Sequence, residues 1–522
     1  MYVKKILVLV SLYILISGGA VWAHGKNNSS PAPSPELPSH DHGKSSGSKK
    51  LSRTVGETTY NHMCSFCHGL DGNGGGKARA YLYPWARDFR KGIFKFRSTP
   101  TGSLPLDSDI FKTITRGIPG TAMPAWGSSM PEEQTWAVVE HIKTFSKRFQ
   151  EEKPKASFEV KDPPDTTPKS IKNGESIYSE TRCGQCHGSD LAGGGVQADN
   201  LYDIWDRRAF VYNLTDPNNY KRGFNKKDIY TILTAGMDGT PMKSYNHLTE
   251  AERWDLVAFV ESKIKKELYQ PARYENDLIS TKIEAEEIEI DPEDPVWKNV
   301  PSKDVHMFPL SARKSYINRI KFQSIFNEDS IAFRLEWEDK TPDRTTSRVQ
   351  DFRDAAAMEF ALGNVLLHQH GHNEPFFGMG NREKVVNIWQ WKADWQQDIE
   401  TKKKLDNATK DMDLDVMIFG GEVNPVESLN PFREIPVEEM NAEGFGTLTP
   451  QHITKQNVEG KGVWKNGRWA VVFYRTLESL NKWDIKFDKK VPVLVSFAVW
   501  DGTHRDRNGR KVIAMWQRLN LP

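Results

Sequence analysis

The chain has 522 residues and a nearly balanced charge, with 71 Lys and Arg against 69 Asp and Glu and a formal net charge of +2 at pH 7. Proteins that bind nucleic acid normally carry a strongly basic surface, so the composition gives no case for nucleic acid as a partner. The length predicts about three domains. The sequence shows neither a phosphate-binding glycine loop nor a catalytic-triad pattern.

The first 23 residues have the pattern of a secretory signal peptide. Lys4 and Lys5 precede an apolar run over residues 6–16, and Val-Trp-Ala ends at residue 23 before a polar segment. The apolar run is short for a membrane span, although an uncleaved anchor is the alternative. Residues 24–50 are rich in Ser, Pro, Gly and Lys and predict a disordered linker. We therefore expect an exported protein in the periplasm or an equivalent extracytoplasmic compartment, free or associated with the membrane.

Two Cys-x-x-Cys-His motifs contain all four cysteines of the chain. They are Cys64-Ser65-Phe66-Cys67-His68 and Cys183-Gly184-Gln185-Cys186-His187. This pattern predicts covalent c-type haem, because two thiols bond to one porphyrin while the adjacent His68 or His187 reaches its iron. One four-cysteine zinc site or a set of disulfides are the alternatives. A zinc site would not need the histidines and usually has its cysteine pairs closer together, so the spacing favours two haems c.

An internal repeat with an offset of 119 residues (183 minus 64) relates the segments around the two motifs. In each copy a methionine follows the histidine by the same interval, because 123 minus 68 and 242 minus 187 both give 55. Met123 and Met242 both lie in turn-rich segments, Gly-Thr-Ala-Met-Pro and Gly-Thr-Pro-Met-Lys. Cytochromes c use a thioether as a distal iron ligand, so we predict Met123 and Met242 in that role. Met237 is the competitor in the second copy, but the first copy has an isoleucine at the matching position.

Each copy resembles a class I cytochrome c domain, a small all-helical fold around one haem. The resemblance rests on the haem motif, the methionine segment and a final amphipathic helix, which is expected over residues 131–149 and 249–266. The expected domains are 51–150 and 169–272, joined by a proline-rich linker over 151–168. Residues 273–295 are acidic and are expected to form a solvated linker.

The rest of the chain, residues 296–522, changes from helical to extended patterns. Apolar residues alternate over 331–337, and β-branched and aromatic runs cover 469–474 and 491–500. A mainly antiparallel β-sandwich is the expected fold. The predicted fold class is therefore multidomain, with two all-α class I cytochrome c domains followed by a β-sandwich.

This last domain resembles the haem b subunit of ethylbenzene dehydrogenase and the related γ subunits of periplasmic molybdenum enzymes. The segments that carry the resemblance are 375–380 (Pro-Phe-Phe-Gly-Met-Gly), 386–394, 444–448, 497–502 and 507–511. In that family a methionine and a lysine hold the iron of a haem b. The resemblance implies Met379 and Lys511 as these ligands, with Lys461 and Lys465 as alternative lysines.

Aromatic and imidazole side chains near Met379 add further candidates. Trp389, Trp391 and Trp395 are candidates for the wall of the haem b pocket, although large aromatics are common in any core. His368, His370 and His372 lie on one face of an extended segment, a spacing that suits zinc or copper. A solvent-facing loop is the simpler interpretation of that segment.

Together the resemblances imply an electron-transfer subunit that carries two haems c and one haem b and transforms no substrate itself. It would relay electrons between the iron-sulfur and molybdenum subunits of an oxidoreductase, similar to nitrite oxidoreductase or nitrate reductase, and a soluble cytochrome. Two alternatives stay open. One is a dihaem enzyme similar to a peroxidase or thiosulfate dehydrogenase, which needs a displaceable distal ligand. The other is a haem or metal sensor module.

Overall fold

The computed structural model describes residues 46–269, 277–346, 348–363, 365, 374–408, 434–489 and 491–522. The predicted signal peptide, residues 24–45 of the predicted linker, and His368, His370 and His372 lie outside the described residues. Among the described helices, none is both long and apolar enough to cross a membrane.

The first helical unit contains the first haem motif. Its elements are α1 (Ser46–Thr59), a π-turn (Tyr60–Cys64), α2 (Ser65–His68), α3 (Asp107–Arg116), α4 (Glu132–Lys143) and α5 (Arg148–Glu151). Helix α1 begins at Ser46, within the segment that was expected to be a disordered linker. The helix expected over 131–149 is broken after Lys143, where the chain turns so that Phe145 packs against Tyr60 and His141.

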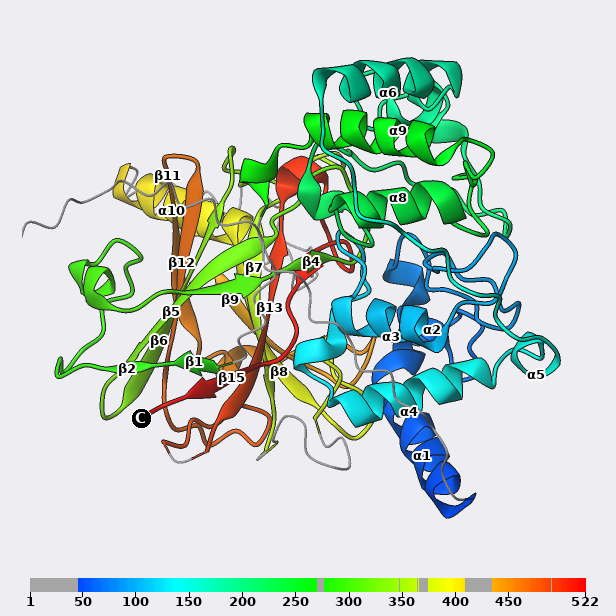
Figure 1. Ribbon diagram of the computed structural model, residues 1–522. Helices are drawn as coiled ribbons and strands as arrows, with labels where there is room; N and C mark the ends of the chain where they lie inside the picture. Colours follow the sequence, from blue (N-terminus) through cyan, green and yellow to red (C-terminus); the bar gives the residue numbers. More distant parts are fainter. Residues whose placement is uncertain are drawn as a thin grey trace, which may run out of the picture. The chain divides into compact units, whose positions relative to one another are not determined.

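The second helical unit contains α6 (Pro168–Glu180), α7 (Gly184–His187), α8 (Lys226–Ala235) and α9 (Glu250–Lys263), with α6 and α9 side by side (Figure 1). A glycine allows this close approach, because a Cβ on Gly174 would lie 2.0 Å from the Asp255 carbonyl oxygen. Helix α9 ends at Lys263, three residues before the expected end at 266, and a 3₁₀ turn (Lys266–Leu268) follows it.

The two helical units repeat each other in their contacts as well as in sequence. A Cβ on Gly56 in α1 would lie 2.1 Å from the Ala137 carbonyl oxygen in α4, as at Gly174 in the second unit. Phe111 stacks on Trp136 with ring centroids 4.2 Å apart, and Tyr230 stacks on Trp254 at 4.1 Å. Helix α4 in the first unit and α9 in the second therefore pack on the first and third helices of their units in the same way.

The remaining strands form two sheets that pack as a mainly antiparallel sandwich. In the larger sheet the order is β1 (Asp277–Ile279), β15 (Gln517–Asn520), β13 (Val493–Trp500), β7 (Ala355–Ala361), β8 (Val386–Lys392), β9 (Val437–Ala442) and β10 (Thr449–Pro450), with β14 (Val512–Ile513) and β4 (Phe308–Pro309) off this path. In the smaller sheet the order is β11 (Glu459–Lys465), β12 (Arg468–Thr476), β6 (Ser330–Glu338), β5 (Arg319–Phe326) and β2 (Thr281–Lys282), with β3 (Lys303–His306) beside β5. Only the β1–β15 and β2–β5 pairs are parallel among the described strands. Helix α10 (Ala393–Ala408) follows β8.

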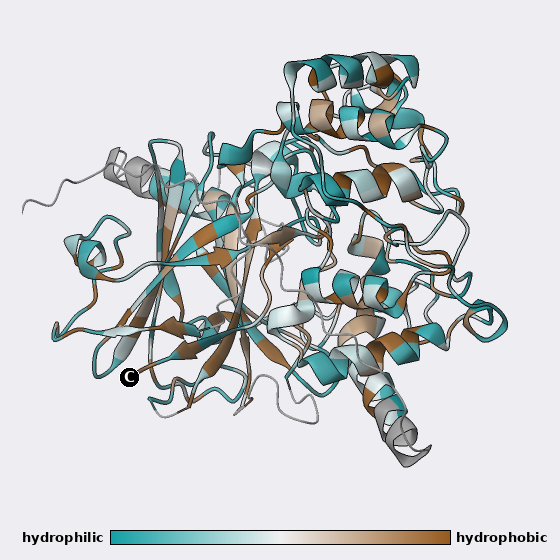
Figure 2. Ribbon diagram, in the orientation of Figure 1, coloured by the Kyte–Doolittle hydropathy of each residue, from teal (hydrophilic) through white to brown (hydrophobic). Residues whose placement is uncertain are grey.

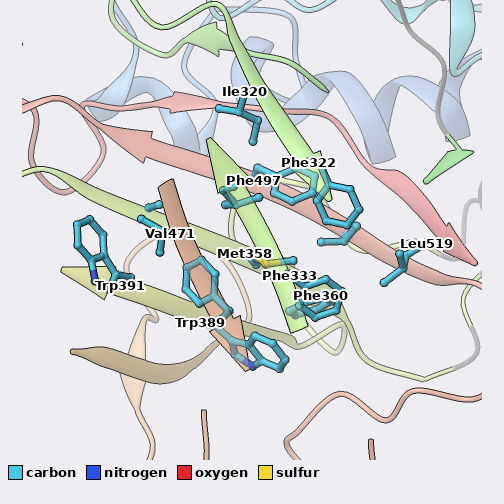
Figure 3. Packing of buried hydrophobic residues seen from close by; sticks show 14 of the residues in the cluster. Ile320, Phe322, Phe333, Met358, Phe360, Trp389, Trp391, Val471, Phe497 and Leu519 are labelled. Carbon is cyan, nitrogen blue, oxygen red and sulfur yellow. The ribbon is translucent and has the colours of Figure 1, made fainter. Parts of the chain in front are cut away.

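The strands of both sheets contain many hydrophobic residues (Figure 2), and the sandwich core lies between the two sheets, where large apolar side chains pack together (Figure 3). Trp389 and Trp391 of β8 belong to this core and are fully buried. The expectation that they line a haem pocket is therefore wrong for these two residues. Side chains alternate along a strand, and the indoles occupy the face of β8 that points at the smaller sheet.

The opposite face of the larger sheet is covered by the first helical unit. Ile388, Ala498 and Trp500 from the sheet belong to one hydrophobic cluster with Ile110 and Val138 from α3 and α4. A sheet covered on both faces has strands that are apolar throughout, and all eight residues of β13 are buried. The first helical unit and the sandwich thus share a core.

The segment expected to be a solvated acidic linker is instead part of the sandwich. It contributes β1 and β2, which pair with β15 and β5. Ile288 then packs with Trp297, Ala332 and Val472 on the outer face of the smaller sheet. The acidic residues dominate the composition of this segment, but the few apolar ones cover a hydrophobic surface.

Candidate cofactor sites

The first haem motif places its cysteines and histidine on the wall of a cavity. The π-turn and α2 present Cys64, Cys67 and His68 to this space. The His68 Nδ1 lies 3.1 Å from the Arg87 carbonyl oxygen. A carbonyl only accepts, so Nδ1 carries the hydrogen and Nε2 keeps its lone pair. Burial lowers the pKa of His68 to about 4, which keeps the imidazole in the neutral form that binds metals.

The second motif repeats this arrangement with one difference. Cys183, Cys186 and His187 line the same cavity, and burial lowers the pKa of His187 to about 4. The His187 Nδ1 is buried and has no hydrogen-bond partner among the described residues. The first histidine is therefore oriented by a carbonyl, and the second is held by packing.

All four cysteines are free thiols at two separate places in the fold. Burial raises the pKa of Cys64 and of Cys67 to about 12. No group of cysteine and histidine side chains converges on one point among the described residues, so the single four-cysteine zinc site is excluded for them, and no disulfide is formed.

The loop that carries each predicted distal methionine is fixed by a threonine. The Met123 amide donates to the Thr121 hydroxyl at 3.2 Å, and that hydroxyl donates to the Ile118 carbonyl at 2.7 Å. Thr240 makes the same two bonds, to the Met242 amide at 3.2 Å and to the Met237 carbonyl at 2.7 Å. Both Met123 and Met242 line the cavity. Met237 lines it too and occupies the place of Ile118, so the match between copies still favours Met242.

One continuous cavity of about 450 Å³ contains both predicted c-haem ligand sets. Partly buried cations lie on its wall. Burial lowers the pKa of Arg87 to about 10 and that of Lys95 to about 8, and it lowers the pKa of Lys221 well below its usual value. The Lys221 ammonium donates to the Pro119 carbonyl and lies 3.2 Å from the centre of the Tyr212 ring.

Salt bridges hold the two helical units together around this cavity. Arg97 of the first unit is fully buried and pairs with Asp238 of the second at 2.8 Å. In the opposite direction, Arg222 pairs with Asp109 at 3.3 Å. No local sequence pattern indicates these pairs, because each joins residues more than a hundred positions apart.

The structure brings Met379 and Lys511 together in the sandwich domain. The Lys511 Nζ lies 3.9 Å from the Met379 sulfur and 4.7 Å from the centre of the Trp500 ring. Burial lowers the pKa of Lys511, which favours the neutral amine that can bind a metal, although the Glu359 carboxylate opposes this shift. Met379 has a φ of 103°, a strained value for a residue with a side chain, and its amide donates to Glu359 at 3.1 Å.

The alternative lysines lie elsewhere. Lys461 pairs with Asp291 at 3.2 Å, and Lys465 pairs with Glu293 at 2.9 Å, both with partly exposed side chains. These partners belong to the acidic segment on the outer face of the smaller sheet. Of the three candidate lysines, Lys461, Lys465 and Lys511, only Lys511 therefore lies beside Met379. Trp395 lies against Lys392 at 3.6 Å from ring centre to ammonium and not at Met379.

An aromatic contact joins the first haem motif to the Met379 segment. Phe66, inside the motif, stacks on Phe376 with centroids 4.4 Å apart. Phe376 and Phe445 also line the cavity that holds the c-type motifs, and Phe445 stacks on Tyr81 of the first unit at 5.5 Å. The Met379 site and the first c-type site are therefore adjacent.

The residues present fit haem as the bound group. Each c-type site offers two thiols, a neutral imidazole and a thioether, which are the donors that covalent haem requires. The partly buried cations on the wall suit its anionic carboxylates, and the rest of the lining is mostly apolar.

Three family models match successive parts of the chain: cytochrome c oxidase, cbb3-type, subunit III over residues 52–142, cytochrome c over 171–263, and ethylbenzene dehydrogenase over 294–512. This chain fuses two cytochrome c domains to an ethylbenzene dehydrogenase-type domain. The predicted fold class is confirmed.

Two curated relatives match almost half of this chain. It is 28% identical over 250 residues to the putative respiratory nitrate reductase heme subunit ORF7 of Haloferax mediterranei, covering 47% of this chain and 73% of that one. It is 25% identical over 239 residues to the chlorate reductase subunit gamma of Ideonella dechloratans, covering 44% and 79%. Among solved structures, it is similar to a chain of the reducing HAO-like protein complex of Kuenenia stuttgartiensis, with 36% identity, coverage of 40% and 96%, and a TM-score of 0.39.

Proposed function

We propose that this chain is an exported electron-transfer subunit, itself non-catalytic, of an oxidoreductase complex. It would exchange electrons with iron-sulfur and molybdenum subunits of nitrite oxidoreductase or nitrate reductase type on one side and with a soluble cytochrome on the other. The two curated relatives, a nitrate reductase heme subunit and a chlorate reductase subunit gamma, support this class of complex.

Ten residues would hold three haems. Cys64, Cys67, His68 and Met123 bind the first haem c, Cys183, Cys186, His187 and Met242 bind the second, and Met379 and Lys511 bind a haem b. Bound haem supplies reversible one-electron exchange at its iron. The protein would tether the c haems through the cysteines, keeps both histidines neutral and places partly buried cations where anionic groups would need compensation.

The continuity of the three sites is the observation that carries this proposal. Both c-type ligand sets open into one cavity, and Phe66 joins the first of them to the segment that carries Met379. This arrangement supports the order haem b, first haem c, second haem c. It also disfavours a peroxidase-like enzyme, because a threonine fixes the methionine loop at both distal positions.

Haem stoichiometry tests the assignment. We expect a pyridine haemochrome assay of the purified chain to count two haems that resist acid-acetone extraction and one that is extracted. Met379→Leu should lose the extractable haem and keep the other two. Met358→Leu is the control, since Met358 is buried between the sheets and this swap conserves volume. A fully loaded protein with no extractable haem would contradict the b-type site.

The relay is tested separately by reduction kinetics. In the Met379→Leu protein, a small chemical reductant should still reduce the c haems. The partner complex should no longer reduce them, because its electrons would have to pass through the missing haem b. Unchanged reduction of the c haems by the partner would refute the proposed order.

A further inference from the structure

Three aspartates meet at one rim of the sandwich and are not part of the wall of the cavity that contains the c-type motifs. Asp339 directly follows β6 of the smaller sheet, Asp354 directly precedes β7 of the larger sheet, and Asp501 directly follows β13. One carboxylate oxygen from each lies within 4.8 Å of the others. The side chains are buried, with 6%, 0% and 8% of the residue surface exposed respectively. The cluster thus bridges the two sheets.

Among the described residues, no lysine or arginine compensates the charge of two of these carboxylates, whereas Asp501 pairs with His504 at 2.6 Å. Neither Asp339 nor Asp354 forms an ion pair with a lysine or arginine in the part of the chain that the structure describes. Burial and the neighbouring carboxylates raise the pKa of both groups. Buried carboxylates of like charge are unfavourable unless a proton or a cation joins them.

One oxygen of the cluster lacks any hydrogen bond. The Asp339 Oδ1 accepts from the Thr341 amide at 3.1 Å, whereas Oδ2 is buried without a partner. The Trp337 indole N–H lies beside Asp339 and lowers the pKa of its carboxyl, but neither this N–H nor Oδ2 has a described partner in good hydrogen-bond geometry. A buried carboxylate oxygen without a well-formed hydrogen bond is the exception in native proteins and calls for an explanation such as a bound group.

The other two carboxylates are held in fixed orientations. Asp354 accepts from the Gly502 amide at 2.8 Å, the Asp343 amide at 2.7 Å and the Trp469 indole at 2.9 Å. Asp501 lies 2.6 Å from the His504 Nδ1. In three of these four contacts an N–H group donates to the carboxylate, which favours its ionised form. The two carboxylates are therefore already oriented and can bind a cation without rearrangement.

We propose that Asp339, Asp354 and Asp501 bind one Ca²⁺ ion that ties the two sheets together at this rim. All the candidate ligands are hard oxygen donors, with no thiol or thioether among them, and such sets select Ca²⁺, Mg²⁺ or Mn²⁺ over the softer metals. Ca²⁺ accepts irregular carboxylate geometry, whereas Mg²⁺ demands near-ideal octahedral geometry. Three carboxylates from three different strand ends form an irregular set of ligands, which suits Ca²⁺ better than Mg²⁺.

The position of the site gives it a structural role. Asp501 begins the loop that runs through a 3₁₀ turn (Gly502–His504) to Lys511, immediately before β14. Asp506, in the middle of this loop, is held by Arg313 at 2.7 Å. A cation at Asp501 would therefore anchor the first end of the loop whose last residue faces Met379. The Ca²⁺ site itself does not depend on the proposed electron-transfer function.

The test uses the full chain with its haems. Elemental analysis of the desalted protein should find one calcium per chain, and removal with EGTA should lower the thermal midpoint, which CaCl₂ restores. Isothermal titration of the EGTA-treated protein with CaCl₂ should show one site. Asp339→Asn should weaken this binding at least about tenfold, because it removes a charged ligand. Asp304→Asn is the matched control at the exposed position of β3, and it should bind Ca²⁺ as the wild type does.

Terbium gives a second measurement that needs no variant. Trp469 donates to Asp354, so a lanthanide at the site should show emission sensitised by tryptophan, and Ca²⁺ should displace it. The proposal is overturned if the wild type shows neither calcium uptake nor a calcium-dependent midpoint. It is also overturned if Mg²⁺ raises the midpoint as much as Ca²⁺ does. If Asp339→Asn raises the thermal midpoint and CaCl₂ changes the midpoint of neither protein, the carboxylates share a proton and bind no metal, which also overturns the proposal.

Discussion

The contact between α6 and α9 gives a sharp prediction, because a single methyl group should disrupt it. A Cβ at Gly174 would lie 2.0 Å from the Asp255 carbonyl oxygen and 2.8 Å from the Phe259 Cβ. Ordinary van der Waals contact begins at 3.4 Å, so Gly174→Ala must push the two helices apart by more than an ångström or bend one of them. The oxygen belongs to the backbone and cannot rotate away.

The expected cost follows from two opposing effects. Overpacking of this kind costs about 1–3 kcal/mol, and the rigid backbone contact places Gly174→Ala at the upper end. Alanine in a helix interior regains up to about 1 kcal/mol over glycine. The net destabilisation is therefore about 1–2 kcal/mol. Gly194→Ala is the control, since nothing lies within 4 Å of its Cβ and its φ is not positive. That change should be neutral or stabilise by about 0.4–1 kcal/mol.

Hydrogen exchange measured by mass spectrometry resolves this effect in the full chain. Amides of α6 and α9 should exchange about five- to thirtyfold faster in Gly174→Ala, while α1 and α4 of the first unit keep their protection. Gly194→Ala should leave the α6 and α9 rates unchanged or slower. Equal effects of the two substitutions, or faster exchange only outside α6 and α9, would refute the argument that glycine sets the helix separation.

Three further changes test other parts of the structure. Thr121→Val removes both loop bonds next to Met123; at about 1 kcal/mol each, the fraction of oxidised protein without methionine ligation should rise roughly tenfold or more, measured by absorption and magnetic circular dichroism, and an unchanged spectrum would argue against the fixed loop. Arg97→Met leaves Asp238 unpaired and should cost about 3 kcal/mol in urea unfolding, whereas Lys227→Met, which breaks the exposed pair with Asp162, should cost less than about 1 kcal/mol. Burial lowers the pKa of His141 below 6.5, so the unfolded state binds more protons and stability should fall as the pH drops below 6.5; His141→Phe should flatten this part of the unfolding profile, and an equally steep profile would contradict it.

The sequence was sufficient for features that depend on local spacing. The Cys-x-x-Cys-His pentapeptides place their own thiols and histidine on one short helix. The common interval to Met123 and Met242 predicted two equivalent loops, and the structure shows the same threonine bonds in both. The strand pattern over 469–474 likewise falls within β12, and the pattern over 491–500 contains β13, which begins two residues later than expected, at Val493.

Features that depend on which surface a residue meets could not be predicted in this way. Period-two alternation shows that Trp389 and Trp391 share a face of β8, but not whether that face meets the second sheet or a cofactor. Acidic composition concealed Ile288 and its contacts on the smaller sheet. The Arg97–Asp238 pair requires the two cytochrome units to face each other, which a linear pattern cannot show.

The two cytochrome units differ most where their surroundings differ. The hydrophobic core of the first unit merges with the larger sheet, whereas the cluster of the second contains only residues of that unit and of the linker before it. At the same position inside the haem motif, the first unit has Phe66, which stacks on Phe376, and the second has the polar Gln185. The repeated motif thus has an apolar residue, Phe66, in the unit that packs on the larger sheet, and a polar residue, Gln185, in the other unit. This asymmetry makes the first unit the physical link between the Met379 site and the second unit, which is what a linear relay requires.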